Sequence, residues 1–165
     1  MIAYFSFFSL SRTVPSLGET AIFLPLAVGA GTTFCTIIMH ALALIAIVGV
    51  VRFKHRLDRA GVRFRRDLNI VAITALLALA AHLIAIVVWA VVFVVCGEFS
   101  DLTLAFYHSA VNYTSLGYGD VVMSVSWKLL GPLETADALL MFGVSTAMVF
   151  AVIQQLVQER GGFNS

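Results

Sequence analysis

Charged residues are scarce in this chain. Only 12% of its 165 residues are Asp, Glu, Lys or Arg, and 61% are hydrophobic, whereas a soluble domain has about 25% charged and 45–50% apolar residues. This deficit excludes a soluble globular domain. A helix needs about 20 apolar residues to cross a bilayer core of about 30 Å, and the apolar runs are long enough for three crossings. Little chain is left over, which leaves no room for a separate soluble catalytic domain. No spacing of Ser, His and Asp forms a catalytic triad, so no enzyme is expected.

Cysteine is almost absent as well. Cys35 and Cys96 are the only two, and they form neither a metal-binding spacing nor a disulfide framework. At about 1.5 Å per helical residue, counted from the same end of the membrane, their depths differ by about 15 Å. A disulfide needs Cα atoms within about 7 Å. We expect two unpaired cysteines that serve as small packing residues.

Three long apolar runs predict an all-α membrane protein. They place transmembrane helices at residues 26–51, 70–96 and 132–157. The aromatic-rich residues 1–25 before them are typical of a segment at the outer membrane interface.

A shorter helix is expected between the second and third spans. Residues 101–114 are too few and too polar to cross a bilayer, and Ser100 or Asp101 would cap them. Such a segment would enter the membrane and return, which is permitted only where its backbone is buried in protein or lines a water-filled cavity.

Basic residues are concentrated in one loop, residues 52–69. Seven of the ten Lys and Arg residues lie between Arg52 and Arg66. Because basic loops stay in the cytoplasm, the N-terminus and residues 97–131 are expected outside, and residues 158–165 form a short cytoplasmic tail. Nucleic-acid binding is excluded because membrane spans flank the loop on both sides.

The basic loop has two possible interpretations. The arginine spacing resembles that of a voltage-sensor helix, with Arg56, Arg59, Arg63 and Arg66 three or four residues apart. The stretch is short, however, and also contains acidic residues. We therefore expect a linker that binds anionic membrane lipids.

Acidic residues predominate outside. Glu98, Asp101, Asp120 and Glu134 against Lys128 give residues 97–134 a net charge of −3, which would concentrate cations locally. Glu134 and Asp137 are expected to interact with the positive end of the third helix's dipole.

A glycine motif follows the short helix directly. Its residues are Thr114, Ser115, Leu116, Gly117, Tyr118, Gly119 and Asp120. The motif resembles the potassium-channel selectivity filter, a Thr-Val-Gly-Tyr-Gly-Asp pattern in the pore-loop ion-channel superfamily. The alternative is a glycine-rich outer turn, but the preceding short helix and the flanking spans favour the filter.

The resemblance implies a chemistry that suits the residues. A K⁺ ion that leaves water needs replacement oxygens, and rings of backbone carbonyls from four chains can supply them. The carbonyls of Ser115, Leu116, Gly117, Tyr118 and Gly119 would bind K⁺, and no other cofactor is expected. Carbonyls that point the same way require left-handed backbone, which glycine tolerates.

One filter residue departs from the family pattern. Ser115 stands where the family has threonine, so it keeps the hydroxyl but lacks the methyl that restricts the rotamer. Strict selectivity for K⁺ over Na⁺ is therefore less certain than conduction of K⁺.

The resemblance also assigns supporting roles. Tyr107 and His108 would brace the filter from the short pore helix, with His108 bonded to Tyr118 or a neighbour. Gly143 in the inner helix would be a hinge, or alternatively a point of close helix packing. The cavity-facing residues at helical spacing would be Val144, Ala147, Ala151 and Gln155.

His40 and His82 lie inside spans, and we expect each to be neutral and bonded to a neighbouring helix.

Together these features predict a homotetrameric channel with residues 70–157 as its pore domain. The outer helix (70–96), pore helix (101–114), filter (115–120) and inner helix (132–157) would conduct K⁺ passively, in a bacterial plasma membrane. Two alternatives remain open: a weakly selective cation channel and a non-conducting partner subunit.

Overall fold

The computed structural model describes residues 20–57 and 63–161, and this part of the chain contains four helices and no strand. The helices are α1 (Thr20–Leu57), α2 (Arg63–Val95), α3 (Leu102–Tyr113) and α4 (Leu130–Gly161). Three of them are long and apolar enough to cross a membrane, over Ile22–Val51, Asp67–Val95 and Leu130–Gln158. The expectation of an all-helical chain with three membrane spans is confirmed.

The helix boundaries differ from those expected at both ends of the first span. α1 begins at Thr20 rather than at residue 26 and contains Pro25. Transmembrane helices tolerate proline because neighbouring groups compensate for the lost hydrogen bond, so the apolar residues before Pro25 extend the helix.

At the other membrane face, much of the basic segment 52–69 is helical, because α1 continues to Leu57 and α2 begins at Arg63. The rest of the expected basic loop, and the expectations for residues 1–19 and 162–165, lie outside the described residues.

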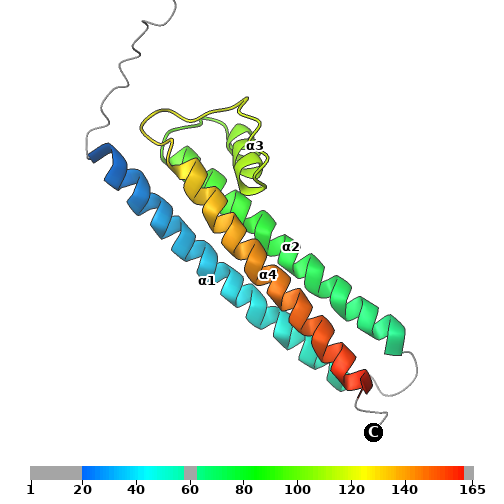
Figure 1. Ribbon diagram of the computed structural model, residues 1–165. Helices are drawn as coiled ribbons and strands as arrows, with labels where there is room; N and C mark the ends of the chain where they lie inside the picture. The colour runs from blue at the N-terminus through cyan, green and yellow to red at the C-terminus, as the bar shows by residue number, and fades with distance from the viewer. Residues whose placement is uncertain (1–19, 58–62, 162–165) are drawn as a thin grey trace, which may run out of the picture.

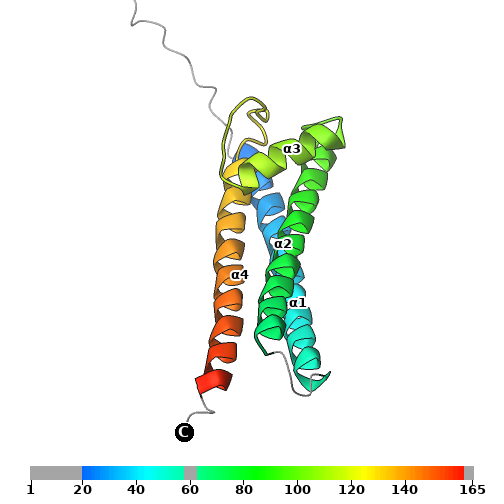
Figure 2. The ribbon, with the colours of Figure 1, turned by 90° about the vertical axis from the view of Figure 1, so that its right-hand side faces the viewer.

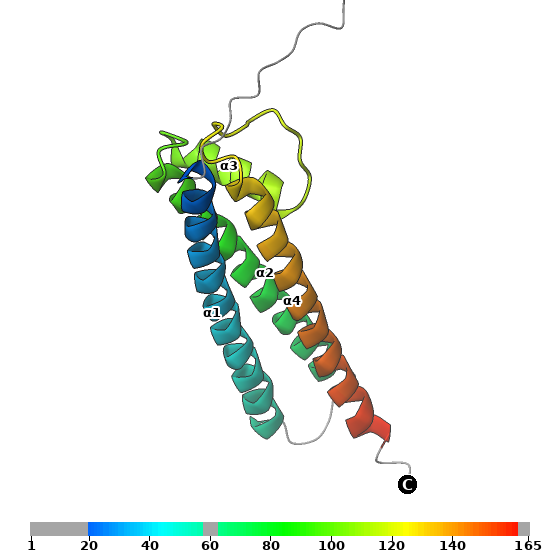
Figure 3. The same cartoon turned by 60° about the vertical axis from the view of Figure 1, so that its left-hand side comes forward.

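The three long helices lie side by side, with α1 packed against both α2 and α4 (Figure 1). α3 lies across one end of this bundle, where α2 ends and α4 begins (Figure 2). The start of α1 is at this same end (Figure 3). We call this the α3 end of the bundle and the opposite one the far end.

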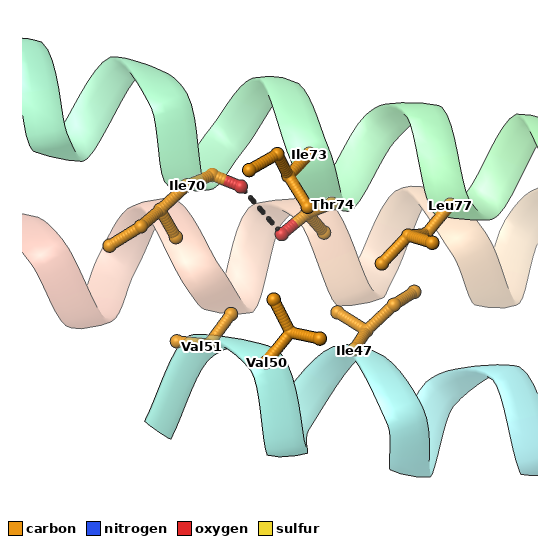
Figure 4. Close-up of a pocket in the computed structure, with 7 residues that line it drawn as sticks. All are labelled: Ile47, Val50, Val51, Ile70, Ile73, Thr74 and Leu77. Atoms are coloured by element: carbon orange, nitrogen blue, oxygen red, sulfur yellow. Dashed lines mark hydrogen bonds between the residues drawn. The ribbon is translucent and has the colours of Figure 1, made fainter. Parts of the chain in front are cut away.

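Each end has its own core. The α3 end contains a cluster of aromatic and small side chains that includes Trp89, Phe93 and Tyr113, all fully buried. The far end contains only aliphatic side chains in its cluster: Ile47, Val51, Ile70, Val152 and Leu156. Figure 4 shows α1 and α2 meeting there, with no space between them large enough for a water molecule.

Candidate functional site

The short helix α3 delivers the glycine motif. Asp101 is its N-cap and accepts hydrogen bonds from the amides of Thr103 and Leu104, at 3.1 and 3.3 Å. Its C-cap, Thr114, bonds the carbonyl of Ala110 through its hydroxyl at 2.6 Å. The helix thus occupies the range that the sequence predicts, with both ends fixed locally.

The segment after the helix, residues 115–120, is called here the Gly-Tyr-Gly segment. Its first three amides turn back onto the helix. Those of Ser115, Leu116 and Gly117 donate to the last carbonyls of α3, those of Asn112 and Val111, at 2.9 to 3.4 Å. The start of the segment is therefore anchored through its N–H groups.

Alternate residues of this segment have left-handed backbone. The φ angles are +60° at Ser115, +60° at Gly117 and +72° at Gly119. The two glycines occur where left-handed backbone was expected, but no feature of the sequence indicated that Ser115 would also adopt it. A β-branched residue is strongly disfavoured at positive φ, which gives a physical reason for serine rather than threonine.

The carbonyl oxygens of this segment have no partner inside the chain. Among the described residues, none donates a hydrogen bond to the carbonyls of residues 115–119, and residues 114–120 are all exposed. The ring of Tyr118 is 67% exposed, so within one chain it does not pack behind the segment. The arrangement leaves five backbone oxygens available to a ligand.

Tyr107 and His108 hold the C-terminal end of the Gly-Tyr-Gly segment. The hydroxyl of Tyr107 donates to Asp120 Oδ2 at 2.7 Å. His108 Nδ1 lies 3.0 Å from the carbonyl oxygen of Val121, and because a carbonyl only accepts, Nδ1 carries the proton. Nε2 then accepts from Asn112 Nδ2 at 2.9 Å. The partners of His108 are therefore Val121 and the neighbouring pore-helix residue Asn112, and not Tyr118.

These contacts shift the titration of the three groups. The hydrogen bond from Tyr107 lowers the pKa of Asp120, and the same bond raises the pKa of Tyr107. Burial lowers the pKa of His108, while the Val121 carbonyl and the carboxylates of Asp120 and Glu98 oppose this shift. Asp120 is thus ionised and His108 neutral at pH 7.

Two intramembrane histidines bond to neighbouring helices, as the sequence suggested. His40 Nδ1 lies 2.9 Å from the carbonyl of Thr36, and His40 Nε2 lies 3.4 Å from His82 Nδ1. His82 Nδ1 is also 3.1 Å from the hydroxyl of Tyr113. The three side chains link α1, α2 and α3.

Glu134 and Asp137 lie near the start of α4, as expected, but their partners are side chains on other helices and not only the helix dipole. α4 begins at Leu130, so neither is in its first turn, and both are buried, with exposures of 0% and 2%. Glu134 contacts Ser109 on α3, and Asp137 contacts Thr36 on α1 and Trp89 on α2. The sequence did contain a signal for these contacts. Two acidic residues three positions apart lie inside a predicted span, where ionisable side chains usually face the interior of the bundle.

The expected cavity stripe faces away from the rest of the chain. Val144, Ala147, Ala151 and Gln155 are all exposed. α4 continues through Gly143, and a Cβ added there would meet nothing within 4 Å. Close packing at Gly143 within one chain is therefore excluded, and the hinge stays a prediction.

An open groove of about 460 Å³ runs between α2 and α4 and is lined by residues that include His82, Phe142 and Phe150. Its walls are mainly apolar. The cysteines are both free, as expected. Across the described residues, no group of three or more His, Cys, Asp or Glu side chains could hold a metal ion.

Comparison with known proteins gives one match. Residues 81–155 match the model of a family described as "Ion channel". These residues cover the second half of α2 from residue 81 onward, all of α3, the Gly-Tyr-Gly segment and most of α4. No curated protein and no solved structure matches the chain. The match supports an ion channel of the pore-loop type in a membrane, and it points to a channel rather than an enzyme.

Proposed function

We propose that four copies of this chain form a potassium-selective channel, with the Gly-Tyr-Gly segments around a central pore. The observation that carries the proposal is the backbone of residues 115–119. Its first three amides are anchored to α3, alternate residues are left-handed, and its carbonyl oxygens have no partner among the described residues. Stacked rings of such oxygens can replace the hydration shell of K⁺.

A tetramer is proposed because one chain supplies only part of each ion-coordination ring. A single segment supplies one side of a coordination ring, so a closed pore requires rotational symmetry. The exposed stripe on α4, from Val144 to Gln155, would face the common axis below the filter. K⁺ is the bound ion, and Ser115 to Gly119 bind it through backbone oxygens only.

A weakly selective cation channel is the second candidate, and Ser115 is the observation that favours it. Without the threonine methyl, the hydroxyl at the innermost site is less restricted. Both candidates place the N-terminus outside and the C-terminus in the cytoplasm of a bacterial plasma membrane, with the basic segment 52–69 against anionic lipids.

Measuring K⁺ efflux from liposomes tests the proposal. Purified protein is reconstituted into K⁺-loaded liposomes, and K⁺ efflux is followed with a proton-coupled dye, with valinomycin as the reference for total releasable K⁺. The same assay with Na⁺ gives the selectivity. K⁺ flux with little Na⁺ flux is expected. Equal fluxes would favour the weakly selective channel, and no flux from a folded tetramer would favour a non-conducting subunit.

The assembly is tested separately by native mass spectrometry in mild detergent. Four chains of 17.8 kDa each should give the dominant complex. A conducting preparation that contains only monomers or dimers would contradict the tetramer.

A further inference from the structure

Two buried acids on α4 have no cation beside them. Glu134 is 0% and Asp137 2% exposed, and none of the described Lys or Arg side chains pairs with either. Glu134 Oε2 and Asp137 Oδ1 have no hydrogen-bond partner within the described residues. Residues three apart share a helix face. Since an unpaired buried charge is very costly, two neighbouring carboxylates cannot both stay ionised here, and at least one holds a proton.

Asp137 is bonded by side chains of two other helices. Its Oδ2 accepts a hydrogen bond from Trp89 Nε1 at 2.9 Å, and an indole nitrogen is a donor in every state. The hydroxyl of Thr36 lies 2.8 Å from the same oxygen and also 2.8 Å from the carbonyl oxygen of Thr33 in its own helix. Asp137 therefore has an obligate N–H donor.

Glu134 has different surroundings. Its Oε1 contacts Ser109 Oγ, and Ser109 Oγ lies 2.9 Å from the carbonyl oxygen of Ile86. The amide of Asn112 also approaches Glu134 and gives one of its two Nδ2 hydrogens to His108.

The number of protons decides how these contacts are made. A serine hydroxyl has one hydrogen, and a backbone carbonyl has none to give. If Ser109 donates to Ile86, the hydrogen between Ser109 and Glu134 comes from the carboxyl group. If Ser109 donated to a carboxylate instead, no hydrogen would lie between Ser109 Oγ and the carbonyl oxygen of Ile86, which are 2.9 Å apart. Only a protonated Glu134 satisfies both contacts.

We propose that Glu134 is a positioning residue that acts as a neutral carboxylic acid, donating its proton to Ser109 and thereby fixing α3 between α2 and α4. Through Ser109, one hydroxyl joins all three helices. Thr135 adds a parallel link, because its hydroxyl donates to the carbonyl of Asn112 at 3.0 Å. Asn112 in turn bonds His108, which holds Val121. The inference that these contacts position a selectivity filter rests on the proposed function.

Infrared spectroscopy tests the protonation without reference to conduction. The wild-type protein in liposomes at pH 7 is compared with Glu134→Gln, a variant of similar shape that has no carboxyl proton. The difference spectrum should contain the carbonyl band of one un-ionised carboxylic acid. The matched control, Asp137→Asn, should retain that band. Ser109→Ala should keep the acid but shift its frequency, because its hydrogen-bond acceptor is lost. Absence of the band in the wild type, or its persistence in Glu134→Gln, would overturn the proposal.

Flux measurements test the positioning role. Glu134→Gln can still donate to Ser109 and should retain K⁺ flux and the preference for K⁺ over Na⁺. Glu134→Leu has no donor and should lower K⁺ flux by about tenfold, the factor that corresponds to about 1.4 kcal/mol, as expected for a lost buried hydrogen bond. If the Gln variant loses flux as the Leu variant does, a neutral donor is not what the site requires. If the wild type conducts nothing, the proposed function fails while the infrared result still decides the protonation.

Discussion

The two ends of the bundle are held together differently. At the α3 end, side chains from all four helices exchange hydrogen bonds, among them Thr36 with Asp137 and Ser109 with Glu134. At the far end, the cluster is aliphatic and the buried Thr74 bonds the carbonyl of Ile70 in its own helix at 2.8 Å. Asp67 is a further buried polar group at this end. Lipid is as apolar as the aliphatic side chains, so apolar contact alone does little to fix helix positions in a membrane. The α3 end, which carries the candidate filter, is therefore the more constrained one.

The largest effect is expected from Gly117→Ala. The substitution puts a methyl on a residue with φ +60°, at a strain of about 1–3 kcal/mol per chain, repeated in each copy around the pore. K⁺ flux in liposomes should be lost. Gly49→Ala is the matched control, because its added Cβ also meets nothing within 4 Å but its backbone is helical; it should conduct normally. Full conduction by Gly117→Ala would show that the segment is not the filter.

A matched pair of threonine variants compares the two ends directly. Thr36 and Thr74 are 0% and 1% exposed, and threonine to valine removes the same hydroxyl from each. Thr36→Val breaks the link between α1 and α4 and should lower the free energy of unfolding by about 0.6–1.7 kcal/mol, the range for hydrogen bonds between membrane helices. Thr74→Val should change it by less than about 0.5 kcal/mol.

Unfolding in mild detergent, followed by circular dichroism during denaturant titration, measures both variants. Equal losses of stability would mean that the hydrogen bonds at the α3 end add nothing beyond packing.

A smaller effect is expected from acid. The lowered pKa of His108 means that the folded state resists its protonation, so its contribution to stability is complete above about pH 6.5, the ordinary value for histidine. It is lost as the pH falls from there through the lowered pKa. The neighbours that face His108 are the rings of Phe93 and Phe99 and the carboxylates of Asp120 and Glu98.

A charged His108 would also point an N–H at the donor amide of Asn112. K⁺ flux should therefore fall as the external pH is lowered from 7.5 toward 5. In His108→Phe, flux relative to its own value at pH 7.5 should change less. Superimposable curves for the two proteins would move the response to another group, with Glu98 the next to test.

A small gain in stability is expected from Gly143→Ala. Alanine has space at this exposed position and favours the helix by about 0.5–1 kcal/mol, so the protein should become slightly more stable. If Gly143 is a hinge, K⁺ flux should nevertheless fall, because the stiffer helix opens less often. Unchanged flux in a more stable protein would exclude the hinge.

The sequence by itself determined the features that depend on local composition. Span length follows from consecutive apolar residues, the short helix from its cap at Asp101, and the left-handed positions Gly117 and Gly119 from the absence of a side chain. These need only near neighbours along the chain. For the same reason, the resemblance of the segment around Gly117 and Gly119 to a selectivity filter could be recognised before any contact was known.

Only the tertiary structure decided the partners of the buried polar groups. Glu134 was assigned to a helix dipole because its true contact, Ser109, lies 25 residues away, and Thr36 lies 101 residues from Asp137. His108 bonds Val121 rather than Tyr118 because the chain returns over α3 after the segment. A buried hydrogen-bonding group must find a partner wherever packing places one, and packing brings together residues whose separation along the chain carries no pattern.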